Sequence, residues 1–186
     1  SAASDVYKRQ LANLLTRFQD AQASAERVIS LINTDSDIID RPDVIKKYGQ
    51  IGNLKKENWE PLHGDIELID VGFKYKSGET VMEHMNLKVK AGSSVAIVGP
   101  TGAGKSTIVN LICRFYEPTS GQILIDGIDY RERSQEWLHS HLGYVLQTPQ
   151  LFSGSIKENI RYGKLDATDE EIIAAAKLAN ADGFIR

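Results

Sequence analysis

Three things are missing from this 186-residue sequence, and each absence excludes a class of protein. Cys113 is the one cysteine, so no internal disulfide can form and a disulfide-built scaffold is excluded. No run approaches the roughly 18 apolar residues that cross a bilayer, and the start has no signal-peptide pattern. Neither sign of charge dominates, because 22 basic and 25 acidic residues leave a net charge of -3 and the basic residues form no run. Nucleic-acid binding by bulk positive charge is therefore not expected.

The first ten residues are set apart from the rest. Residues 5–10, Asp-Val-Tyr-Lys-Arg-Gln, read as the translation of a transposon-end adapter used in sequencing libraries. We therefore interpret residues 1–10 as an artefact and leave them out of fold reasoning. The alternative is an ordinary polar N-terminus, and a longer genomic clone that encodes the same residues in frame would establish it.

Two segments of different character follow. From Leu11 to Ile32 apolar residues recur at three- and four-residue steps, which predicts one amphipathic helix over residues 11–32. Residues 34–63 are polar, contain prolines and glycines, and show no sustained period. That stretch is predicted to be a linker.

The pattern changes again at Gly64. Near-alternating apolar residues predict antiparallel strands over residues 65–75 and 84–90. The continuous apolar run SSVAIVG, residues 93–99, is of the kind found in a strand covered on both faces, and STIVNLICRFY, residues 106–116, has a helical distribution of apolar residues. The 41% hydrophobic content is enough for a core.

Between that strand and that helix lies a glycine-rich loop. Its sequence has the phosphate-loop spacing of a glycine, four residues, then Gly-Lys-Ser. The glycines let the backbone curl so that amide hydrogens point inward, and the following helix adds its positive N-terminal end. The expected phosphate-binding residues are Gly99, Pro100, Thr101, Gly102, Ala103, Gly104, Lys105, Ser106 and Thr107. The alternative is a glycine-rich turn that binds nothing.

Three residues of this loop have distinct expected roles. Lys105 is expected to reach the β- and γ-phosphates as a point charge, and the Ser106 hydroxyl to complete the coordination of a magnesium ion. Thr107 adds a contact to the α-phosphate. A phosphate loop alone does not choose among kinases, small GTPases, helicases and transport ATPases.

Two flanking elements narrow that choice. With Tyr75 upstream and GYVLQTPQLFSGSIKENI, residues 143–160, downstream, the sequence resembles the ABC transporter family, specifically the exporter type. Residues 11–33 resemble the cytosolic end of the last transmembrane helix, residues 34–63 the linker, and residues 64–186 the N-terminal half of the nucleotide-binding domain. The resemblance implies an α/β fold: an incomplete P-loop nucleoside triphosphate hydrolase fold with a small antiparallel β subdomain, preceded by an amphipathic helix.

The resemblance assigns roles to two residues outside the loop. Tyr75 matches the aromatic residue on which this family stacks the adenine ring, although a strand tyrosine is ordinarily a packing residue. Gln147, at the end of the apolar strand expected over residues 143–147, matches the glutamine whose amide oxygen meets magnesium or the attacking water. The alternative is a polar strand cap. The expected catalytic residues are thus Lys105 and Gln147, the expected magnesium ligands Ser106 and Gln147, and the expected cofactors ATP and Mg²⁺.

The remaining segments, residues 123–180, are predicted to form a strand, a turn, a loop and helices. The run ILIDG, residues 123–127, could be mistaken for a Walker B strand, but Gly127 follows Asp126 where the family places a glutamate base. We predict a strand and a turn there. Residues Thr148 to Ile160 match the family's loop beside the groove for coupling helices, and their own sequence predicts only a loop followed by a short helix. A capping-box pair, Thr168 and Glu171, predicts a helix over residues 169–180.

The resemblance implies a membrane-embedded ATP-driven exporter. Its nucleotide-binding domain would lie on the cytoplasmic side of the cell membrane, with its own or a partner transmembrane domain and a second nucleotide-binding domain as partners, and no nucleic acid. The alternatives are a soluble ABC ATPase or importer subunit, a non-ABC phosphotransferase, and a binding module without turnover. Cargo and the choice between homodimer and heterodimer stay open.

Several catalytic motifs of the family do not occur in the sequence. These are the Walker B aspartate with its glutamate, the LSGGQ-type signature and the switch histidine. We therefore interpret both ends as truncated and expect the chain itself to bind ATP at most. Its central strand would lack neighbours, so we expect the chain to aggregate or to be partly ordered when expressed alone.

Overall fold

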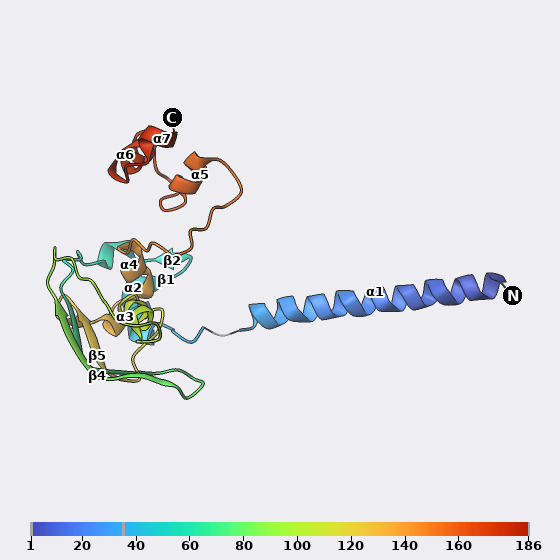
Figure 1. The fold of residues 1–186 in the computed structure, drawn as a ribbon, viewed down its shortest axis with the longest axis horizontal. Coiled ribbons are helices and arrows are strands. Elements are labelled where there is room, and N and C mark those ends of the chain that lie inside the picture. Colours follow the sequence, from blue (N-terminus) through green and yellow to red (C-terminus); the bar gives the residue numbers. More distant parts are fainter. Residues whose placement is uncertain (1, 35, 186) are drawn as a thin grey trace. The chain divides into compact units, whose positions relative to one another are not determined.

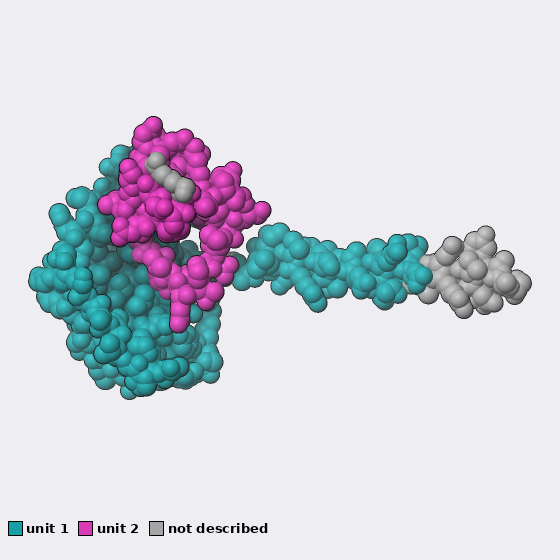
Figure 2. Space-filling model, turned by 45° about the horizontal axis from the view of Figure 1, so that its top comes forward, with its two compact units in different colours: residues 1–142 teal, residues 143–186 magenta. Residues whose placement is uncertain are grey.

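The computed structural model describes residues 2–34 and 36–185, with side chains from residue 13 onward apart from residue 35 (Figure 1). The chain forms two compact units, residues 1–142 and 143–186, which are coloured separately in Figure 2.

Helix α1 (Ala2–Ile32) opens the chain. It ends at the predicted residue and begins earlier than predicted, because residues 2–10 continue the same helix. Helical geometry does not bear on where those residues come from, so their interpretation as an artefact stays a prediction. Described side chains along α1 are exposed, including Leu14, Phe18 and Ile29. Among the described residues, no helix combines the length and the apolar character that crossing a membrane requires.

The predicted linker contains more regular structure than its sequence pattern indicates. It forms helix α2 (Pro42–Tyr48), the hairpin of β1 (Gly49–Gln50) and β2 (Asn53–Leu54), and the 3-10 turn η1 (Lys56–Asn58). Pro42 supplies a preset φ for the first turn of α2. Val44 and Tyr48, four residues apart and therefore on one helix face, are buried at 2% and 1% exposure. Burial of these two side chains stabilises the helix. With seven residues, α2 is too short for its apolar residues to show a helical spacing in the sequence.

A four-stranded antiparallel sheet forms the body of the first unit. Its order is β4 (Thr80–Val89), β3 (Ile66–Lys74), β5 (Ser120–Ile125) and β6 (Ile128–Asp129). Pairs Leu68 with Leu87 and Leu68 with Ile123 fix the register of β3 against its two neighbours. The predicted pair of strands is confirmed, with β4 starting four residues earlier than expected.

Two helices pack on one face of this sheet (Figure 1). They are α3 (Lys105–Ile112) and α4 (Gln135–Ser140), the latter preceded by the 3-10 turn η2 (Tyr130–Glu132). Their apolar residues and those of the strands make one core: Leu68, Val71, Phe73, Ile108, Leu111, Ile123, Ile125, Tyr130, Trp137 and Leu138. The core therefore fixes the direction of α3, which begins at the phosphate loop.

The turn between β5 and β6 confirms the interpretation of the ILIDG run. Asp126 and Gly127 both have left-handed φ values, 51° and 78°, as a two-residue hairpin turn requires. The Asp126 carboxylate accepts hydrogen bonds from the backbone N–H groups of His63, Gly64 and Asp65, at 2.8, 2.9 and 2.9 Å. This acid anchors the end of the linker.

The predicted strand over residues 93–99 is wrong for this structure. That run belongs to no strand, and Val95 and Val98 are 53% and 88% exposed. The strand expected at residues 143–147 is absent as well, with Val145 95% exposed. A strand needs a hydrogen-bonding neighbour, and none of the described strands pairs with either run. An apolar pattern alone cannot supply that neighbour.

The second unit consists of short helices: α5 (Ile156–Arg161), α6 (Asp169–Leu178) and α7 (Asp182–Ile185). The capping box at Thr168 and Glu171 is present, so the predicted start of α6 is confirmed. Helix α5 has the same arrangement at Ser155 and Glu158, which confirms a loop followed by a short helix. Asp169 pairs with Lys157 of α5 at 2.5 Å and so joins the two helices.

Candidate nucleotide-binding site

The phosphate loop has an unusual backbone. Gly102 and Gly104 take left-handed φ values of 85° and 81°, and Ala103 donates its N–H to the Pro100 carbonyl at 3.2 Å. Gly104 is the N-cap of α3. The loop thus reverses direction immediately before the helix, as the sequence predicted.

The three loop glycines are required for different reasons. A Cβ on Gly104 would lie 2.9 Å from Cγ1 of Val81 in β4, so that site is both strained and crowded. A Cβ on Gly102 would meet nothing within 4 Å, so only its φ requires glycine. Gly99 lacks a left-handed φ, but its Cβ would lie 3.3 Å from that of Ala103. The sequence did not identify Val81, because nothing in a β-branched strand residue indicates that it will lie against Gly104.

Lys105 places its positive charge over the loop. Its ammonium donates to the carbonyl oxygens of Gly99 at 2.9 Å and Pro100 at 2.7 Å. These contacts hold Nζ at the loop, where it can meet phosphate oxygens. Lysine suits this task because an ammonium is a compact charge with three donors.

The first turn of α3 adds backbone donors beside that charge. Its first i to i-4 hydrogen bond runs from the Ile108 N–H to the Gly104 carbonyl, at 3.0 Å. The N–H groups before it, those of Lys105, Ser106 and Thr107, have no partner within a helix of this geometry. They add to the positive end of the helix dipole, which makes the turn suited to an anion.

Two hydroxyl side chains of that turn differ in exposure. Ser106 is exposed next to the loop, whereas Thr107 is 6% exposed. No group of three or more His, Cys, Asp or Glu residues able to hold a metal ion occurs in the described part of the chain. The role of Ser106 as a magnesium ligand stays a prediction.

Tyr75 lies next to the start of α3. Its hydroxyl and that of Thr107 share a hydrogen bond of 3.0 Å, and its ring meets Phe73 and Tyr116 edge-on at 4.9 and 5.6 Å. Tyr75 also lines a hollow of about 550 Å³ with Phe73, Tyr116 and Thr119. The structure thus brings the predicted base-stacking residue to the loop. The Thr107 contact could not have been predicted, because the two residues are 32 positions apart.

Gln147 differs from the other predicted site residues in the unit to which it belongs. It belongs to the second unit and is exposed, while the other site residues belong to the first unit. Thr101 and Ala103 are exposed residues of the loop itself. The roles of Gln147 as a catalytic residue and magnesium ligand stay predictions.

Comparisons with known proteins indicate one family. The family model described as ABC transporter matches residues 82–185. The chain is 44% identical to an uncharacterized ABC transporter ATP-binding protein, YfiC, of Bacillus subtilis, over 94% of this chain and 27% of the relative. It is 43% identical to a fatty acid ABC transporter ATP-binding/permease protein of Mycobacterium tuberculosis, over 95% of this chain and 26% of the relative. The chain thus spans about a quarter of the length of these relatives.

A solved structure gives the same result for the fold. A bacterial Atm1-family ABC exporter with ATP bound matches 89% of this chain and 27% of that chain, with 35% identity and a TM-score of 0.70. Its similarity supports the incomplete P-loop fold predicted from the sequence.

Proposed function

Because this chain belongs to the ABC transporter family, we propose that its phosphate loop binds ATP and that it is the ATP-binding part of an exporter. The observation that carries the proposal is the ammonium of Lys105, held at a left-handed glycine turn in front of the first amides of α3. A cation, free amides and a helix N-terminus at one point are what a triphosphate requires.

Each site residue would have a defined task. Lys105 would neutralise the β- and γ-phosphates, and the ring of Tyr75, oriented by its bond to Thr107, would stack on the base. Magnesium supplies charge neutralisation to the phosphates when bound, and Ser106 would be its protein ligand in this loop. Gln147 would orient the attacking water, and this role rests on the family resemblance.

Export is the transport direction that the relatives favour. One relative, named a putative multidrug export ATP-binding/permease protein of Bacillus subtilis, is 43% identical over 95% of this chain, and the solved relative is an exporter. Both cover more of this chain than residues 64–186 alone, so both include part of the segment that precedes the nucleotide-binding fold. We propose that the parent protein is an exporter that also contains a transmembrane domain and a second nucleotide-binding domain. Its phosphate loop would lie on the cytoplasmic side of the membrane. This chain by itself would bind ATP without hydrolysing it, since its sequence has no acid-glutamate pair after an apolar strand.

Titration of the purified parent protein with ATP and Mg²⁺ tests the site. Lys105→Ala is expected to abolish saturable binding, whereas Lys88→Ala, which removes the same charge from the sheet, is expected to leave it unchanged. Tyr75→Ala should weaken binding about 5- to 150-fold by loss of stacking, and Tyr75→Phe by less than about tenfold. Equal binding by the parent protein and Lys105→Ala would overturn the proposal.

A further inference from the structure

Arg114 is a buried charge at the far end of the phosphate-loop helix. It follows α3 closely, has a left-handed φ of 56° and is 1% exposed. Its guanidinium donates through Nε to Glu117 at 2.8 Å and through Nη1 to the Arg133 carbonyl at 2.9 Å. The proposed function uses none of these contacts.

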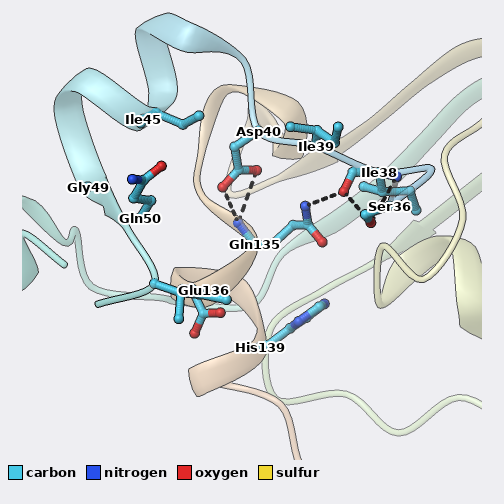
Figure 3. Close-up of a pocket in the computed structure, with 11 residues that line it drawn as sticks. Ser36, Ile38, Ile39, Asp40, Ile45, Gly49, Gln50, Gln135, Glu136 and His139 are labelled. Carbon is cyan, nitrogen blue, oxygen red and sulfur yellow. Dashed lines mark hydrogen bonds between the residues drawn. The ribbon is translucent and has the colours of Figure 1, made fainter. Parts of the chain in front are cut away.

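The same Nη1 also reaches the linker. It donates to Oδ1 of Asp40 at 2.9 Å, and the Asp40 side chain is 14% exposed. Asp40 in turn accepts the backbone N–H of Gln135, the first residue of α4, at 3.1 Å from Oδ2 (Figure 3). The Gln135 side chain donates to the Ile38 carbonyl at 3.1 Å. The linker is thus held at the ends of two helices through one carboxylate.

Such a pair has a physical cost that calls for an explanation. Burying two charges costs several kcal/mol per ion, and an apolar pair of similar volume is often as stable or more stable. Arginine and aspartate, however, fix one relative position through directed hydrogen bonds. The Arg114–Asp40 pair therefore specifies where the linker sits more than it stabilises the fold.

The pair and the phosphate loop lie at opposite ends of one rigid element. Helix α3 has eight residues, about 12 Å in length, with Lys105 at its start and Arg114 just beyond its end. His139 of α4 donates to the Cys113 carbonyl at 2.9 Å and fixes that end further. Because the helix is one rigid element, a displacement of its start on phosphate binding would act on Arg114 and on the contacts that hold it.

The linker also has room to respond. A hollow of about 390 Å³ lies between the linker and α4, lined by Ile39, Ile45 and Gln50 on one side and Glu136 and His139 on the other (Figure 3). The segment is anchored at Asp40 and loosely packed beside it. The free space is confined to this hollow, because Val44 and Tyr48 of the same segment are buried.

We propose that Arg114 and Asp40 are positioning residues that couple nucleotide at Lys105 to the linker, and through it to the helix that precedes it. The proposal rests on the proposed function, because it needs ATP at the loop. It gives the nucleotide a direct route along α3 to the linker, which is independent of the second unit.

Hydrogen exchange on the parent protein tests this coupling, with a non-hydrolysable ATP analogue and Mg²⁺ as the probe. The analogue should slow exchange in residues 99–107, and in residues 36–48 by about fivefold or more, the lower end of measured coupling. Asp40→Asn should keep the first effect and lose the second. Asp37→Asn, which removes the exposed linker ion pair with Lys76, is the matched control and should keep both.

The outcomes separate the two proposals. No slowing at residues 99–107 in the unsubstituted protein contradicts the proposed function, and the coupling falls with it. Slowing at the loop without slowing at the linker, or an Asp40→Asn variant with unchanged linker response, overturns the coupling alone. If Asp40→Asn does not fold, the double variant Asp40→Leu with Arg114→Met removes both charges of this pair and leaves only Glu117, whose side chain is 32% exposed, without its arginine partner. It should show the same loss.

Discussion

At the scale of single residues, Asp126 shows how a side chain identified for one reason serves another. The sequence predicted a turn residue, and the hairpin geometry confirms it. Its three amide partners at residues 63–65 could not be predicted, because they are more than 60 positions away along the chain. Burial pushes the pKa of Asp126 up, but the three amide donors outweigh burial and hold the pKa below its ordinary value.

Asp126→Asn is expected to lower the free energy of unfolding by about 1–3 kcal/mol at neutral pH, because it removes a charged acceptor from three amides. A lowered pKa means that this stabilisation is complete above the unfolded value near 3.9 and is lost as the pH falls through the folded value. The difference between variant and parent protein should therefore shrink below about pH 4. Pulse proteolysis in urea at several pH values measures it, and a difference that grows on acidification would contradict it. Asp166→Asn, at an exposed site, serves as the control.

At the scale of elements, the phosphate loop was the part most fully predictable from sequence. Its glycines, lysine and hydroxyl residues are contiguous, so local geometry alone determines where they lie. Helix α6 was predictable for the same reason, since its capping box lies within one turn. The contact of Gly104 with Val81, by contrast, depends on the packing of β4 against the loop.

That contact separates two otherwise similar substitutions. Gly102→Ala should cost about 1–2 kcal/mol of stability, the strain of a left-handed residue with a Cβ. Gly104→Ala should cost more and weaken ATP binding more, because its Cβ would also crowd Val81 and because Gly104 is the N-cap of α3. Thermal unfolding and ATP titration of both variants check this. Equal effects would show that Val81 moves aside freely.

At the scale of the whole molecule, sequence prediction failed where an element needs a partner. Residues 93–99 have the composition of a central strand, yet strand structure depends on hydrogen bonds to neighbouring strands. None of the described strands provides them, so the apolar side chains of Val95 and Val98 are exposed. The predicted linker shows the opposite case, since its sequence has no sustained period and yet contacts with Arg114 and Trp137 order it.

We expect the 186-residue chain expressed alone to associate and to bind an apolar dye. The reason is the exposed apolar surface of both units, with Val98 at 88%, Val145 at 95% and Leu151 at 85% exposure. Size-exclusion chromatography with light scattering and dye fluorescence measure this. A soluble monomer with a single cooperative melt would refute the expectation.

The attachment of Asp40 to Gln135 has a consequence for biosynthesis. The two residues are 95 positions apart, and the linker leaves the ribosome first. At a translation speed of about 5–20 residues per second, Gln135 is synthesised roughly 5–20 s after Asp40. During that interval the nascent linker cannot form its contact with Gln135. Its polar composition limits association with other chains until α4 has been synthesised.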